Sequence, residues 1–81
     1  MRGKIIEVNY TRGLAIFEDE SGDYGYFEML GEDDIEKDDV ILGNLHSLGS
    51  EIITKVETNE KYDVFIEDWG MSLKIALESI Y

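Results

Sequence analysis

The chain contains no cysteine and no proline. Without cysteine there is no disulfide framework, no thiolate metal site and no cysteine nucleophile, so packing alone must stabilise the fold. Long apolar runs are also missing. No segment approaches the roughly 18 apolar residues of a membrane span, and Met1 leads into charged residues rather than into a signal-peptide pattern. We therefore expect no membrane association and a cytoplasmic location.

Basic residues are scarce. Seven Lys and Arg stand against 19 Asp and Glu, which gives a formal net charge of −12. Nucleic acids and anionic membranes gain affinity from Lys and Arg, so this balance opposes both kinds of partner. Arg2, Lys4 and Arg12 all lie near the start of the chain. They could form a small positive patch. We favour the alternative, in which they are part of an otherwise acidic, solvated surface.

The length of 81 residues predicts one domain, residues 1–81, with a single small core. Short segments rich in β-branched and aromatic residues, separated by turn formers, predict five strands at 3–8, 14–18, 24–29, 40–45 and 51–56. No connection is long enough for a crossover helix, so we expect a small antiparallel barrel rather than a parallel sheet. Gly25, inside the third strand, predicts a bulge or a sharp bend.

The last third of the chain fits two patterns. Residues 61–67 alternate as a strand does, but helical spacing also connects Tyr62, Ile66, Trp69, Leu73, Ala76 and Ile80. Gly70 argues against one unbroken helix through this segment. We therefore predict an additional strand at 61–67 and a helix over about 70–80, capped by Asp68 or Ser72. Tyr62, Phe65 and Trp69 could form an aromatic ligand site, but because they have core spacing we favour packing in the core.

Three motifs in the first two thirds carry a family resemblance. They are Gly3-Lys4-Ile5-Ile6-Glu7-Val8-Asn9, Arg12-Gly13-Leu14-Ala15-Ile16-Phe17 and Gly22-Asp23-Tyr24-Gly25-Tyr26-Phe27-Glu28. In order and spacing they resemble the cold-shock domain, over residues 2–57. The resemblance implies a five-stranded OB-fold barrel with a face that stacks single-stranded nucleic acid on aromatic side chains. Residues 58–81 form an extension beyond it.

The residues at the family's binding positions differ from the family pattern. Glu7 replaces a tryptophan, Leu14 and Ile16 replace phenylalanines, and Glu28 replaces a histidine. Tyr26 remains aromatic. An apolar centre with a charged rim is typical of a protein interface. The candidate face comprises Lys4, Glu7, Tyr10, Arg12, Leu14, Ile16, Tyr26 and Glu28.

Our main hypothesis is a non-enzymatic protein-interaction module that uses this face to bind another protein or a second copy of the chain. The alternative is weak binding of single-stranded RNA or DNA through Tyr26, Tyr10, Lys4 and Arg12. A third hypothesis is an acidic mimic of nucleic acid that occupies a basic partner.

No motif predicts catalysis, a cofactor or a metal site. His46 is the only histidine, and because the sequence suggests no partner for it we expect a surface residue rather than a general base. An acidic run contains Glu32, Asp33, Asp34, Glu36, Asp38 and Asp39. The EF-hand spacing is absent, so a solvated loop is favoured over a cation site.

The candidate face also predicts where the C-terminal helix lies. The register of the cold-shock domain implies that Ala15 and Phe17 point into the barrel. Leu14 and Ile16 then point outward and form an apolar patch that a monomer normally covers. The helix carries an apolar stripe of Trp69, Leu73, Ala76, Leu77 and Ile80. We predict that it packs over this patch, on its own barrel or on that of a second copy. The rival placement is across an open end of the barrel.

Overall fold

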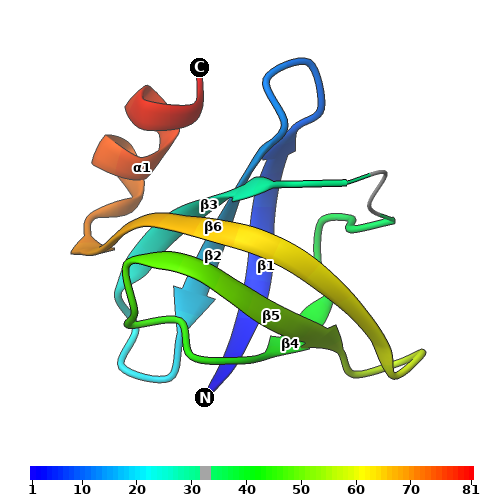
Figure 1. The fold of residues 1–81 in the computed structure, drawn as a ribbon. Coiled ribbons are helices and arrows are strands. Elements are labelled where there is room, and N and C mark those ends of the chain that lie inside the picture. Colours follow the sequence, from blue (N-terminus) through cyan, green and yellow to red (C-terminus); the bar gives the residue numbers. More distant parts are fainter. Residues whose placement is uncertain (32–33) are drawn as a thin grey trace.

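The computed structural model describes residues 1–31 and 34–81. In this part of the chain six strands precede one helix: β1 (Arg2–Asn9), β2 (Leu14–Asp19), β3 (Tyr24–Met29), β4 (Val40–Leu42), β5 (Gly49–Lys55), β6 (Glu60–Met71) and α1 (Leu73–Ile80). The strands close into a barrel in the order β1-β2-β3-β6-β5-β4, and α1 lies against its side (Figure 1). The described residues contain no helix that is long and apolar enough to cross a bilayer.

The barrel joins two antiparallel meanders, β1-β2-β3 and β4-β5-β6. Antiparallel pairs between β1 and β4 and between β3 and β6 close it. The predicted mainly β fold with a closed antiparallel barrel and a C-terminal helix is confirmed. The barrel has six strands rather than five, because the segment predicted as an additional strand belongs to β6, which pairs with both β3 and β5.

The boundary between β6 and α1 differs from the prediction. β6 extends for 12 residues, and Met71 at its end still pairs with Tyr24 of β3. The helix therefore begins at Leu73 rather than near residue 70. Of the two caps considered, Ser72 is the one used, because its Oγ accepts a hydrogen bond from the backbone N–H of Ile75 at 3.3 Å.

The barrel interior is filled by apolar side chains from all six strands. The rings of Phe17 and Phe27 stack with centroids 6.2 Å apart, and Tyr62 packs at the edge of this core. The expectation that Phe65 and Trp69 also lie in the core is wrong, since they are 39% and 38% exposed. Alternation along β6 explains Phe65, because its neighbours on both sides point inward.

Residues 34–39, which precede β4, are attached to the barrel by one buried side chain and several polar contacts. Ile35 is fully buried in the core, and its carbonyl accepts a hydrogen bond from the Tyr10 hydroxyl at 2.7 Å. The Lys55 ammonium donates to the carbonyl of Asp34 at 3.0 Å and pairs with the Asp39 carboxylate at 3.3 Å. Burial alone would lower the pKa of Lys55, but the Asp39 carboxylate outweighs it and raises that pKa. Glu32 and Asp33 of the predicted acidic run lie outside the described residues.

Of the glycines described, Gly25 has the closest backbone neighbours, and the predicted irregularity there is confirmed. The register between β3 and β6 shifts on both sides of Tyr26. A Cβ at position 25 would lie 2.5 Å from Cζ of Phe17, 2.6 Å from the carbonyl oxygen of Asp68 and 2.9 Å from Cα of Trp69. Only glycine allows β6 to cross β3 at this distance.

Replacing Gly25 should therefore destabilise the whole barrel. In Gly25→Ala the new methyl group meets backbone atoms of β6 that cannot rotate away, and we expect a loss of about 3 kcal/mol in the free energy of unfolding. Urea denaturation followed by circular dichroism measures it. Gly22→Asn is the control, because nothing lies within 4 Å of a Cβ there and asparagine tolerates the positive φ. Equal stability of Gly25→Ala and wild type would contradict the close crossing.

Candidate functional site

The apolar patch on β2 is covered by α1. Leu14 is 8% exposed and Ile16 is 0% exposed, and both pack in one cluster with Ala76 and Ile80 of the helix. Ala15 and Phe17, the alternate residues of β2, lie in the barrel core. The predicted packing of the helix over Leu14 and Ile16 is thus confirmed within a single chain, and the rival placement across a barrel end is wrong.

The loop between β1 and β2 holds the C-terminal end of α1. The Asn9 side-chain amide donates to the carbonyl of Ile80 at 2.6 Å. The Arg12 guanidinium donates to the carbonyls of Ser79 at 3.4 Å and Tyr81 at 3.3 Å. These groups satisfy carbonyls that a helix end leaves without partners, and the cation lies at the negative end of the helix dipole. Partial desolvation and the nearby Glu7 carboxylate raise the pKa of Tyr81.

The eight predicted site residues therefore do not form one open face. Leu14, Ile16 and Tyr26 lie against α1, and Arg12 hydrogen-bonds to its end. Lys4 approaches Asp38 at 3.6 Å. The Tyr10 hydroxyl donates a hydrogen bond to the carbonyl of Ile35. Glu28 is exposed and lines a small polar hollow of about 250 Å³ beside Arg12, Tyr26 and Ser79.

A second cluster lies where the β2–β3 hairpin meets β6, and the sequence analysis missed it. His46 Nε2 lies 2.6 Å from Oδ2 of Asp19, whose side chain is 0% exposed. The His46 ring stacks on Trp69, with centroids 4.1 Å apart and an interplanar angle of 11°. His46 thus has a partner, contrary to expectation. Trp69 belongs to this cluster and not to the apolar stripe of the helix.

The Asp19 carboxylate also organises its own hairpin. Its Oδ1 accepts hydrogen bonds from the backbone N–H groups of Ser21 at 2.8 Å and Asp23 at 3.1 Å. Burial alone would raise the pKa of Asp19, but the hydrogen bonds from His46, Ser21 and Asp23 outweigh it and lower that pKa. The Asp19 side chain is 0% exposed and already accepts hydrogen bonds on both oxygens, so it is closed to a substrate. The cluster therefore ties the hairpin, the β4–β5 turn and β6 together.

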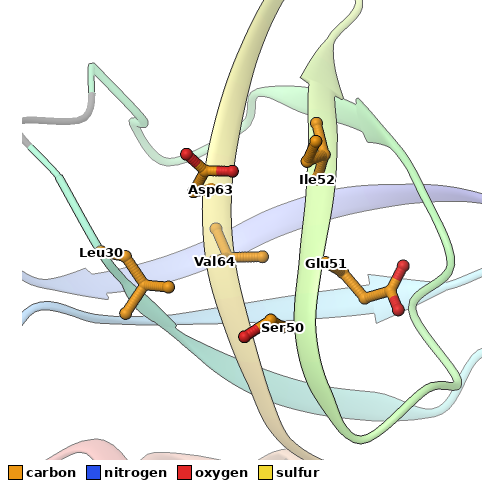
Figure 2. Close-up of a pocket in the computed structure, with 6 residues that line it drawn as sticks. All are labelled: Leu30, Ser50, Glu51, Ile52, Asp63 and Val64. Atoms are coloured by element: carbon orange, nitrogen blue, oxygen red, sulfur yellow. The ribbon is translucent and has the colours of Figure 1, made fainter.

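The outer side of β6 is left uncovered by α1. A groove of about 710 Å³ lies along it, which we call the β6 groove, lined by Leu30, Ser50, Glu51, Ile52, Asp63 and Val64. Figure 2 shows Leu30 and Ile52 on opposite sides of β6, with Asp63 between them. Leu30 is 50% exposed and Ile52 is 58% exposed. Phe65, beside the groove, is opposite Ser50 of β5, so three large apolar side chains share this surface.

The β6 groove is also acidic. Asp63 and Glu51 line it, and Glu28 lies opposite Phe65 on β3. Within residues 1–31 and 34–81 no ion pair involves any of these three carboxylates. Lys61 is the nearest cation along β6, and its ammonium is hydrogen-bonded to the Thr54 hydroxyl at 3.4 Å. The described residues contain no group of three or more potential metal ligands.

Comparison of the chain with protein-family models, curated protein sequences and solved structures gives no match.

Shortening a buried side chain of α1 should loosen the helix from the barrel. Ile80→Ala removes a fully buried side chain, and we expect a loss of about 2–4 kcal/mol in stability. Binding of an apolar dye should increase as Leu14 and Ile16 become accessible. Ile75→Ala is the matched control, because Ile75 is 53% exposed and should change stability by less than about 0.5 kcal/mol. Equal effects of the two variants would show that α1 does not stabilise the patch.

Removing His46 should cost stability in a pH-dependent way. His46→Ala deletes a hydrogen bond to a buried carboxylate, and we expect a loss of about 1.5–3 kcal/mol at pH 7. Because the folded-state pKa of Asp19 is lowered from 3.8, this contribution is present above that value and is lost as the pH falls through the folded pKa.

Urea titrations from about pH 7 to about pH 3 measure the difference in stability between wild type and His46→Ala. We expect this difference to shrink below about pH 4. Leu48→Ala in the same turn, where Leu48 is 67% exposed, is the control and should show no such trend. A difference that stays constant over the whole range would rule out ionised Asp19 as the partner.

Proposed function

We propose that this chain is a small non-enzymatic protein-interaction module, built on an OB-like barrel of cold-shock type, that binds its partner in the β6 groove. The observation that carries the proposal is the exposure of Leu30, Ile52 and Phe65 beside one another on a single sheet surface. A small monomer normally covers such a patch, as α1 covers Leu14 and Ile16. A patch that stays open marks an interaction site.

The proposal moves the binding surface away from the face suggested by the cold-shock resemblance. Leu14 and Ile16 are already occupied by α1, so they are not available to a partner while the helix is docked. The orientation of β2, with Ala15 and Phe17 inside and Leu14 and Ile16 outside, supports a cold-shock type of register. The cytoplasmic location stays a prediction.

Single-stranded nucleic acid is the weaker candidate. Binding of this kind needs stacked aromatics along a basic groove. Of the predicted contacts, Tyr26 is half-buried against α1 and Arg12 is hydrogen-bonded to the helix end. The surface that remains open is acidic and would repel phosphates.

Panning a phage library of random peptides against the immobilised chain tests the proposal. We expect enriched peptides that bind wild type with a Kd of about 1–100 μM and that bind the double variant Ile52→Ser/Phe65→Ser at least tenfold more weakly. Leu42→Ser/Leu48→Ser is the matched control, since both leucines are exposed and lie outside the groove.

Two results would overturn the proposal. One is the absence of any enriched peptide whose binding depends on Ile52 and Phe65. The other is binding of labelled oligo-dT or oligo-U with micromolar affinity at physiological salt, which would favour nucleic-acid binding instead.

A further inference from the structure

The chemistry of the β6 groove restricts what its partner can be. Leu30 and Ile52 form the two apolar walls, and Asp63 lies on the strand between them (Figure 2). Adjacent strands are about 4.8 Å apart, so the two walls are separated by only about two strand spacings. No partner can bury both walls without also removing the Asp63 carboxylate from water.

A carboxylate that is removed from water must be paired, because burying a charge without a partner is strongly unfavourable. Asp63 has no ion-pair partner among the described residues. Glu51 in the groove and Glu28 opposite Phe65 have no ion-pair partner in the described part of the chain either. Lys61, the cation nearest along β6, is hydrogen-bonded to Thr54 instead. We therefore expect the cation for Asp63 to come from the partner.

We propose, resting on the function proposed above, that the β6 groove binds a basic peptide segment that carries two apolar side chains beside a Lys or Arg. The apolar side chains pack on Leu30 and on Ile52 with Phe65, and the cation pairs with Asp63 between them. The carboxylates of Asp63 and Glu51 attract such a segment over a distance of about 10 Å at ordinary ionic strength.

The same charges disfavour the other occupants of an apolar groove. A second copy of this chain, with a net charge of −12, would bring its own Asp63 toward Asp63 in a symmetric contact, because such an interface joins the same patch on both subunits. A nucleic acid adds phosphates to an acidic surface. An acidic or neutral peptide covers the walls but leaves the Asp63 carboxylate buried and unpaired.

Three fluorescein-labelled synthetic peptides of about 12 residues test this inference with the full chain. The first sets a pair of leucines in a Lys/Ser background, the second sets the same pair in a Glu/Ser background, and the third is the Lys/Ser background without leucines. Fluorescence anisotropy gives the three affinities. We expect the Lys/Leu peptide to bind at least tenfold more tightly than either of the others.

The variant Asp63→Leu tests the part played by the carboxylate. This substitution keeps Leu30 and Ile52 and replaces the charge between them by an apolar side chain. The ratio of the affinities for the Lys/Leu and the Glu/Leu peptide should therefore fall at least fivefold. Glu57→Leu removes the same charge from an exposed residue in the β5–β6 turn and should leave the preference unchanged. A far-ultraviolet circular dichroism spectrum confirms that each variant is folded.

The outcomes separate this inference from the proposed function. If the Glu/Leu peptide binds as tightly as the Lys/Leu peptide and binding still needs Ile52 and Phe65, the basic partner is wrong and the interaction module stands. Equal binding of the Lys peptides with and without leucines, insensitive to Ile52→Ser/Phe65→Ser, indicates nonspecific attraction to the acidic chain and overturns the inference. If none of the three peptides binds, the inference is overturned, and the proposed function is decided by the panning experiment.

Discussion

The close crossing of β3 and β6 at Gly25 is the constraint on which the rest of the structure depends. At this position the backbone of β6 passes so near β3 that a single Cβ would overlap with Phe17, Asp68 and Trp69. β6 pairs with β5 from Glu60 to Ile66 and with β3 from Val64 to Met71, so it has both neighbours in its middle. One long strand thereby joins the two meanders.

The same strand decides where the C-terminal helix lies. Because β6 continues to Met71 beside the start of β3, Ser72 and α1 emerge next to the outer side of β2. That strand is buried on both faces: its alternate residues fill the barrel core on one side and the contact with α1 on the other. An eight-residue helix is too short to be stable alone. It is held by this packing and by the Asn9 and Arg12 side chains at its C-terminal end.

The acidic residues divide into two groups by their surroundings. Asp19 and Asp39 are largely removed from water, and each has a cationic or hydrogen-bonding partner within 3.3 Å, as buried carboxylates require. The carboxylates in and beside the β6 groove lack such a partner in the described residues but remain in contact with solvent. Only a partner that covers the groove would change their environment. For this reason we propose that the groove discriminates between partners by charge as well as by shape.

The sequence by itself determined the local elements and several of their faces. Alternation and turn residues located all the strands to within a few residues, Gly25 indicated the irregular crossing, and the outward position of Leu14 and Ile16 required a cover that the helix supplies. Alternation and turn residues act over a few neighbouring positions, whereas the inward side of the strand at 14–18 is what the cold-shock resemblance implies. The sequence does not determine which strands pair across the barrel. It therefore predicts residues 58–81 as an extension of a five-stranded barrel and not as the source of its sixth strand.

Only the tertiary structure decided which distant side chains meet. His46 and Asp19 are 27 positions apart, and no spacing rule connects two residues on different turns. Trp69 followed the helical spacing but lies on β6, because strand pairing overrode that local pattern. The sequence did not indicate the β6 groove either, because its residues are far apart along the chain. Leu30, Ile52 and Phe65 come from three parts of the chain, and only the pairing of β3, β6 and β5 places them on one surface around Asp63.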